Sequence, residues 1–199
     1  MSTHVPRRQA EPKSLLDAEG LGRTLSRIAH EIIERNDDLE SVALVGIHTR
    51  GVPLAERLAG LIEERSDVEV EVGAVDITFH RDDHVSAPEQ PVVHATDLDF
   101  ELAGTTCILV DDVLYTGRTI RAAIETLFEH GRPARVQLAV LVDRGHRELP
   151  IRPDYVGKNL PTARGERVNV RVEEIDGVDE VAIADSRPRE DSGPHGVPA

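Results

Sequence analysis

CILVDDVLYTGRT, residues Cys107–Thr119, joins an apolar run to two adjacent carboxylates and a turn rich in hydroxyls. The apolar run at 108–110 predicts a strand buried on both faces, which is typical of a parallel sheet covered by helices. Asp111 and Asp112 then fall at the carboxyl end of that strand, where open α/β sheets bind their ligands. The TGRT turn leads into an amphipathic helix, whose N-terminus favours an anion. Two acids beside an anion site suit a phosphorylated sugar, and no Walker G-x-x-x-x-G-K-[ST] loop competes with this interpretation.

A second candidate anion site is the tripeptide Thr49-Arg50-Gly51, which follows the apolar run SVALVGI at 41–47. Arg50 offers guanidinium donors, and Gly51 permits a close approach of the backbone to an anion. Taken alone, the tripeptide is more typical of a plain turn than of an anion site. Its position favours binding, because it also follows a buried strand and precedes a helix. We therefore expect it at the same edge of the sheet as the paired acids.

Strand and helix patterns alternate through the core of the chain. Asp17 is a candidate cap for a first helix, whose apolar residues recur at helical spacing: Leu21, Leu25, Ile28 and Ile32. Further helices are predicted at 52–65 and from Ile120 to Phe128, the latter ended by Gly131. Further strands are predicted at 68–78 and 136–142. The alternation indicates an α/β fold with a doubly wound, mostly parallel sheet.

Composition sets limits on location and partners. The 199 residues allow one domain, for which we expect residues 14–184, with a disordered leader at 1–13 and a disordered tail at 185–199. The single cysteine, Cys107, excludes a disulfide framework. Because no segment suits a signal peptide or a membrane span, we expect a cytoplasmic protein without a membrane partner. The formal net charge of -14 argues against nucleic-acid binding by the whole surface, but not by a local basic patch.

The polar segment HRDDHVSAPE at 80–89 is expected to be a mobile loop that covers the site and excludes water. Arg81 is its candidate anion-binding residue. The alternative is a solvated hairpin tip without a binding role. Three histidines, His80, His84 and His94, lack a thiol partner or a regular helical spacing, so we do not expect them to form a metal site.

These motifs resemble the phosphoribosyl pyrophosphate (PRPP) site of type I phosphoribosyltransferases, which implies a small hood formed by C-terminal segments above the sheet. The resemblance implies that the paired acids hold the ribose hydroxyls and that the TGRT loop binds the 5′-phosphate. It also implies that Thr49, Arg50, Gly51 and Arg81 contact pyrophosphate, with Asp111, Asp112 and Arg50 as the catalytic residues. Mg²⁺ is the implied cofactor, held by the two aspartates directly or through water. The implied PRPP and UMP segment comprises Asp111, Asp112, Val113, Leu114, Tyr115, Thr116, Gly117, Arg118 and Thr119.

Tyr115 departs from the purine-salvage members of this family, which carry an aspartate at that position to handle a proton on the purine. A tyrosine, with an ordinary pKa near 10, is not a ready base. The substitution therefore favours a pyrimidine acceptor, uracil, over hypoxanthine or guanine.

Longer runs extend the likeness over residues 15–184 and resemble the PyrR family of bacterial pyrimidine operon regulators and uracil phosphoribosyltransferases. They are RIAHEIIERN (27–36), VGIHTRG (45–51), DITFHRDD (76–83) and VDRGHRELPIRPDYVGKNLPT (142–162). The resemblance implies conversion of uracil and PRPP to UMP and diphosphate, together with binding of the pyr operon mRNA leader that depends on UMP or UTP. It implies a uracil pocket that includes Arg144 and the backbone at Val156, with Tyr155 packed nearby. For Tyr155 and Val156, simple core packing is the alternative.

A candidate RNA surface combines basic residues of the first helix with those of the 144–167 segment: Arg27, His30, Arg147, Arg152 and Lys158. On the residues alone, a solvated surface of mixed charge is the better interpretation, and the acidic C-terminal segment would repel RNA if it lay near the basic residues. Two alternatives therefore remain: a uracil-salvage enzyme without RNA binding, and a regulator that has lost catalysis. The intact acid pair and anion loops count against the second alternative. A symmetric homo-oligomer is also expected.

Overall fold

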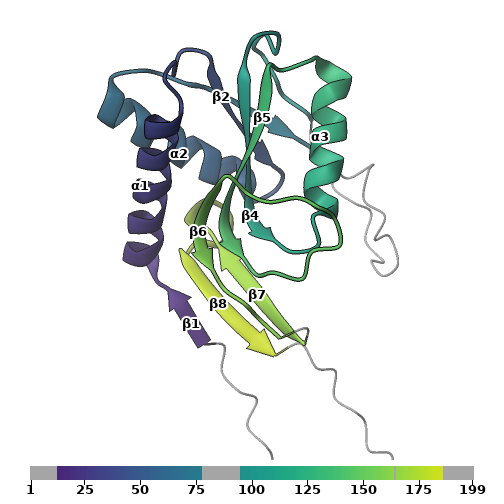
Figure 1. The fold of residues 1–199 in the computed structure, drawn as a ribbon. Helices are drawn as coiled ribbons and strands as arrows, with labels where there is room; N and C mark the ends of the chain where they lie inside the picture. The colour runs from purple at the N-terminus through teal and green to yellow at the C-terminus, as the bar shows by residue number, and fades with distance from the viewer. Residues whose placement is uncertain (1–12, 78–94, 164, 186–199) are drawn as a thin grey trace, which may run out of the picture.

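A five-stranded parallel sheet lies at the centre of the molecule (Figure 1). The structure is a computed structural model that describes residues 13–77, 95–163 and 165–185. The strand order is β3-β2-β4-β5-β6, and every neighbouring pair is parallel. The strands are β2 (Val42–Ile47), β3 (Glu71–Val75), β4 (Thr106–Leu114), β5 (Arg135–Asp143) and β6 (Tyr155–Asn159).

Helices cover both faces of this sheet, as expected from strands that are apolar on both sides. On one face, α1 (Ala18–Arg35) and α2 (Gly51–Ser66) pack with Leu44 and Ile108 into one hydrophobic cluster. On the other face, α3 (Arg118–His130) packs with Val45 and Leu109 into a second cluster. The predicted cap is present, because Asp17 Oδ1 accepts a hydrogen bond of 2.8 Å from the backbone N–H of Gly20. The doubly wound sheet is confirmed.

A smaller antiparallel sheet forms the hood, in the order β1-β8-β7 (Figure 1). Two of its strands, β7 (Glu166–Arg171) and β8 (Glu180–Asp185), flank the short helix α4 (Glu173–Asp176). The third, β1 (Lys13–Leu16), comes from the other end of the chain and pairs with β8. The C-terminal hood is thus confirmed, but the sequence did not predict β1. A four-residue strand has too little pattern, and its partner lies far away along the chain.

Three local predictions were wrong. The paired acids do not follow their strand but lie within β4, which continues to Leu114 because it pairs with β5 as far as Asp143. The strand predicted at 68–78 is limited to Glu71–Val75. Phe128 was counted on the apolar face of its helix but is 49% exposed, while Leu127 is buried. Gly131 does follow the last residue of α3.

Candidate functional site

Three loops that carry the predicted site residues start at the same edge of the sheet. Because β2, β4 and β5 are neighbouring parallel strands, their carboxyl ends lie side by side. The loop after β2 carries Arg50, the end of β4 carries the paired acids and the TGRT turn, and the loop after β5 carries Arg144. The structure therefore brings the two predicted anion loops together, as expected for open α/β sheets.

Both acids are held by backbone N–H groups at the end of β4. Asp111 Oδ1 accepts from the N–H of Asp112 at 3.0 Å, and Asp112 Oδ1 accepts from that of Val113 at 2.7 Å. Asp111 is 7% exposed. Burial raises the pKa of Asp112, although the Val113 N–H and the charge of Arg50 favour its ionised form. A half-buried carboxylate with a nearby cation is suited to bind hydroxyl groups or a metal ion.

The TGRT turn forms an open helix N-terminus. Gly117 has φ +95°, the left-handed region that favours glycine, and it directly precedes α3. The N-cap residue, Gly117, has no side chain that could cap the first N–H groups of the helix. The N–H of Arg118 donates only a long, weak hydrogen bond of 3.4 Å to Thr116 Oγ1. These N–H groups and the positive end of the helix dipole make the turn a suitable cradle for a phosphate, and Thr119 lies in its first helical turn.

The segment after β5 supports this turn from behind. The N–H groups of Glu148 and Leu149 donate to the carbonyl of Thr116 at 3.0 and 3.2 Å. Arg147, which was predicted to bind RNA, donates to the carbonyls of Tyr115 at 2.8 Å and Ile151 at 3.1 Å. It also pairs with the carboxylate of Asp143, and its side chain is 21% exposed. The structure thus places Arg147 behind the phosphate turn.

The loop after β2 is fixed on both sides. Its His48–Thr49 peptide bond is cis, and the N–H of His48 donates to the carbonyl of Val75 at 3.0 Å. Gly51 is needed here because a Cβ atom would lie 2.3 Å from the carbonyl oxygen of Val110. The close approach at Gly51 is therefore to a neighbouring strand. Arg50 forms a bidentate pair with Asp176 of α4, with Nε to Oδ2 at 3.0 Å and Nη2 to Oδ1 at 2.7 Å.

The predicted uracil residues are not adjacent. Arg144 is 7% exposed, and its guanidinium lies 4.1 Å from the centroid of the Tyr115 ring. It donates to Thr162 Oγ1 at 3.1 Å and to the carbonyl of Glu166 at 2.7 Å. Val156 of β6 lies beside Val140 of β5. Val140 is four residues before Arg144, and four residues of an extended strand span roughly 13 Å, so Val156 and Arg144 are separated by about that length. Arg144 and Tyr115 therefore lie together, and Val156 lies apart from them.

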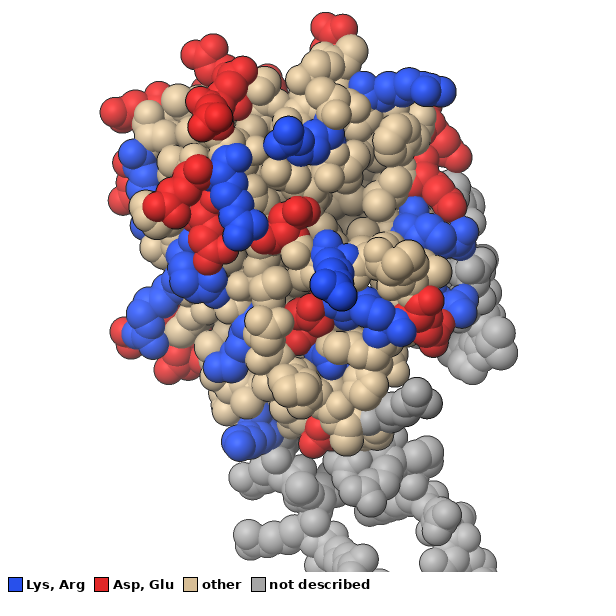
Figure 2. Space-filling view, in the orientation of Figure 1, with Lys and Arg blue, Asp and Glu red and all other residues tan. Residues whose placement is uncertain are grey.

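The candidate RNA residues of α1 and β6 border a groove of about 360 Å³. It is lined by Leu16, Gly20, Arg23, Thr24, Arg27, Gly157 and Lys158. Arg27 donates to the carbonyl of Val156 at 2.9 Å and pairs with Glu31, so it also ties α1 to β6. His30 approaches Glu34 at 3.3 Å, and Arg152 is exposed. Figure 2 shows basic and acidic side chains interspersed over the visible face.

Two expectations concern other parts of the chain. The segment 80–89 with Arg81, His80 and His84 lies outside the described residues, as does His94. Within the described ranges, no cluster of three His, Cys, Asp or Glu side chains could hold a metal ion by itself. No helix among the described residues has the length and hydropathy to cross a bilayer.

The partners of the acidic C-terminal segment were not predicted from the sequence. Asp176 pairs with Arg50, and both Glu174 and Asp179 pair with Arg57 of α2. From the sequence, this acidic segment was expected to repel RNA if it lay near the basic residues. Their partners lie more than a hundred residues away along the chain, so no local pattern could have indicated the pairing.

Comparisons with known proteins agree with this geometry. A family model described as "Phosphoribosyl transferase domain" matches residues 12–174. A "Bifunctional protein PyrR" of Roseiflexus sp. is 60% identical over 172 residues, which cover 86% of this chain and 94% of that protein. Another, from Clostridium novyi, is 59% identical over 169 residues, covering 85% and 95%.

Solved structures show a related fold at much lower identity. Hypoxanthine phosphoribosyltransferase from Trypanosoma cruzi, in complex with the product IMP, has a TM-score of 0.64 and 18% identity, covering 91% of this chain and 94% of that one. The enzyme from Staphylococcus aureus also has a TM-score of 0.64 and 18% identity, covering 92% and 96%. At this identity the likeness establishes the fold alone.

Proposed function

The chain belongs to the phosphoribosyl transferase domain family and, within it, to the bifunctional PyrR proteins. From this membership we propose that it is a uracil phosphoribosyltransferase that also regulates pyrimidine genes by binding their messenger RNA. The reaction converts uracil and PRPP to UMP and diphosphate, within one domain at residues 14–184. The observation that carries the proposal is the meeting of the paired acids, the TGRT turn and the Arg50 loop at one sheet edge.

In this proposal the chain's own residues bind the two ends of PRPP and leave its reacting carbon between them. Asp111 and Asp112 accept hydrogen bonds from the ribose hydroxyls, and the N–H groups of the TGRT turn bind the 5′-phosphate. Arg50 binds pyrophosphate as it leaves and acquires charge. Holding both ends fixes the distance between the uracil nitrogen and the reacting carbon, which removes much of the entropic part of the barrier.

The acid pair also suits Mg²⁺. This ion is usually held by one or two carboxylates and completes its shell with substrate phosphates and water. The absence of a third acidic ligand in the described ranges fits an ion that arrives with PRPP. When bound, it neutralises pyrophosphate charge, and Asp111 and Asp112 would hold it directly or through water.

Uracil is proposed to bind beside Tyr115 and Arg144. The Tyr115 ring is 37% exposed and packs under the guanidinium of Arg144, with His146 at its edge, 6.0 Å between ring centroids. A flat apolar surface with a fixed cation suits a pyrimidine and its carbonyl oxygens. Val156 stays a weaker candidate, because its carbonyl accepts a hydrogen bond from Arg27.

RNA binding is proposed for the groove between α1 and β6, with Arg27 and Lys158 at its border and His30 one helical turn further along α1. The exposed Arg152, in the segment before β6, is proposed as a further RNA contact. The acidic C-terminal segment is a weaker objection than its composition indicates. Among its acids, Asp176 is paired with Arg50, and Glu174 and Asp179 share Arg57, so two arginines offset most of the charge of three carboxylates. A homo-oligomer, which would repeat this groove by symmetry, stays part of the proposal.

The test measures retention of leader RNA from the same genome's pyrimidine genes at physiological salt, with and without UMP. Uracil-dependent release of diphosphate is assayed in parallel. Selective binding that UMP strengthens, together with turnover, is the expected result. Turnover without selective RNA binding would support the alternative, a uracil-salvage enzyme alone.

A double variant locates the RNA surface. Arg27→Ala with Lys158→Ala should weaken RNA binding and reduce the magnitude of its log–log salt slope by roughly 0.7 for each phosphate that the variant no longer neutralises. Uracil turnover should stay unchanged. Arg121→Ala is the matched control, because Arg121 forms a similar i,i+4 ion pair with Glu125 but on α3, across the sheet. Equal loss of both activities in the double variant would contradict this location.

A further inference from the structure

Arg50 is held along one edge of its guanidinium group. Asp176 accepts from Nε and Nη2, which leaves the N–H groups of Nη1 and one of Nη2 without an acceptor among the described residues. The Arg50 side chain is 35% exposed and that of Asp176 is 18% exposed. The pairing therefore fixes the plane of the guanidinium while its second edge keeps donors for another anion.

The carboxylate of Asp176 is itself fixed to a compact turn. Its Oδ2 also accepts from the N–H of Val172 at 2.9 Å, and its own N–H donates to the Val172 carbonyl at 2.7 Å. The turn ends at Gly177, whose φ is +70° and whose N–H donates to the Glu173 carbonyl at 2.9 Å. The pairing with Arg50 lowers the pKa of Asp176. Asp176 is thus an ionised, oriented group on what we name the acidic turn, residues 172–179.

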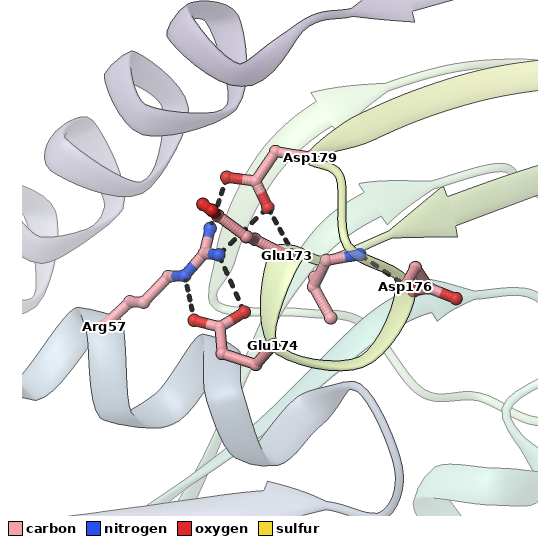
Figure 3. A network of polar contacts seen from close by, with 6 residues as sticks. Arg57, Glu173, Glu174, Asp176 and Asp179 are labelled. Carbon is pink, nitrogen blue, oxygen red and sulfur yellow. Dashed lines mark hydrogen bonds and ion pairs between the residues drawn. The ribbon is translucent and has the colours of Figure 1, made fainter.

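Arg57 anchors the other side of the acidic turn (Figure 3). Its guanidinium forms two hydrogen bonds of 2.7 Å to Glu174 and two of 2.9 Å to Asp179. Asp179 also accepts from the N–H of Glu173 at 2.9 Å. Because the carboxylates of Glu174 and Asp179 each accept two hydrogen bonds, Arg57 restrains the turn at two points. The side chain of Arg57 is 22% exposed. Lysine could not reproduce this fork of donors.

Helix α2 brings the two arginines to the same side. Arg50 has helical backbone angles at the start of α2, and Arg57 follows seven residues later, about two helical turns. Residues at this spacing share a helix face. The acidic turn therefore lies against one face of α2. Arg57 binds this turn through Glu174 and Asp179, whereas Asp176 contacts Arg50 near the edge of the sheet that carries the site.

We propose that Asp176 is a positioning residue that orients Arg50 for the pyrophosphate group of PRPP, and that Arg57 maintains this by anchoring the acidic turn. Orienting the guanidinium before binding lowers the entropic cost of each hydrogen bond to pyrophosphate. The inference rests on the proposed function, since it assigns Arg50 to pyrophosphate. It extends the site to the C-terminal segment of the chain.

The experiment compares Asp176→Asn with the unmutated protein in steady-state kinetics. Asparagine keeps the size but offers one acceptor, and its amide N–H₂ opposes the guanidinium. The KM for PRPP and the inhibition constant of pyrophosphate should both rise about tenfold, with kcat and the KM for uracil within about twofold. Asp176→Glu, which restores a carboxylate, should recover part of the affinity, and Arg57→Lys should raise the KM for PRPP to a smaller extent.

Glu180→Gln is the matched control, because Glu180 lies in the same hood but pairs with Arg171. It should leave the KM for PRPP unchanged. An unchanged KM in Asp176→Asn would overturn the inference. A lower KM would also overturn it, because Asp176 would then compete with pyrophosphate for Arg50.

Calorimetric binding of inorganic pyrophosphate with Mg²⁺ separates this inference from the proposed function. If the unmutated protein showed no uracil turnover, the proposed function would fail, while weaker pyrophosphate binding by Asp176→Asn would still support the positioning role. Should Asp176→Asn not fold, Asp176→Glu and Arg57→Lys are measured in the same two assays, and unchanged pyrophosphate affinity in both overturns the inference.

Discussion

Arginines close together in the sequence have different surroundings in the segment after β5. Arg147 is mostly buried and donates to carbonyls of the phosphate turn, whereas Arg152, five residues later, is exposed. A guanidinium that donates to several backbone carbonyls of a turn acts on the fold of that turn, while an exposed one is available to a partner. The two residues should therefore affect different activities, although both were predicted to bind RNA.

Arg147→Met should weaken UMP and PRPP binding about tenfold, because the carbonyls of the phosphate turn lose a charged donor. Arg152→Met, the matched control, should leave nucleotide binding unchanged and weaken RNA retention. Calorimetric titration with UMP and RNA retention without nucleotide measure the two effects. A loss of RNA binding in Arg147→Met, with UMP affinity intact, would restore Arg147 to the RNA surface.

The half-buried acid Asp112 lowers the stability of the fold but is placed for binding. Because burial raises its pKa, its ionised form is less stable in the fold than in water. Asp112→Asn should lower turnover by at least about 100-fold and leave the Tm equal or higher. Diphosphate release and thermal unfolding measure these, with the exposed Asp99→Asn as the control. Turnover near that of the unmutated protein would show that the ribose site is elsewhere.

Whole elements fix the distance between the two anion loops. Helix α2 starts immediately after the β2 loop and lies against the end of β4, so the loop cannot move without the helix. The contact is closest at Gly51, where no side chain fits beneath the Val110 carbonyl. Strand β4 carries the acids and also pairs with β2, so this backbone contact and the strand pairing together set the spacing of Arg50 and the acid pair.

Gly51→Ala should destabilise the protein by about 3 kcal/mol, because its Cβ would require a backbone shift. Gly60→Ala is the control on the same helix, with nothing within 4 Å of the added Cβ. It should stabilise the protein by about 0.5–1 kcal/mol, since alanine restricts the unfolded chain. Urea unfolding of both variants measures the difference. Equal stabilities would show that the close contact relaxes freely.

Across the whole molecule, the acidic C-terminal segment acts as a docking element for the hood. Glu174 and Asp179 connect it to α2 through Arg57, and Asp176 connects it to the β2 loop through Arg50. The hydrogen bonds from Arg57 lower the pKa of Glu174. Burial alone would raise the pKa of Asp179, but the hydrogen bonds from Arg57 and from the backbone lower it overall. The stability that these acids contribute therefore depends on pH.

Carboxylates with lowered pKa values stabilise the fold fully above their ordinary pKa, near 4, and lose this contribution as the pH falls through the lowered values. Arg57→Met should accordingly lower the Tm by several degrees at pH 7, and the difference from the unmutated protein should shrink below about pH 4. Thermal unfolding between pH 7 and pH 3 measures this, with Arg121→Met as the control for an exposed pair on α3. A difference that stays constant with pH would argue against the ionic anchoring.

Local pattern was sufficient for much of the fold and for the positions of the anion loops. Apolar runs at 108–110 and 41–47 are buried strands, because few other structures bury so many consecutive apolar residues. The end of β4 was misjudged because Asp111 and Asp112 are polar, whereas strand length is set by pairing with β5. The short strand β1 escaped prediction for the same reason, since only β8 stabilises it.

By itself, the sequence determined the parallel α/β fold, the family, and the placement of Arg50, the acid pair and the TGRT turn at strand ends. These follow from hydrophobic period and short motifs, which act over a few neighbouring residues. Only the tertiary structure decided what each charged side chain contacts. In the folded chain, Arg147 donates to a carbonyl of the phosphate turn, Asp176 pairs with Arg50, and Arg57 pairs with the acidic turn. Such pairs form between residues far apart in the chain, because folding brings opposite charges together without leaving a local pattern.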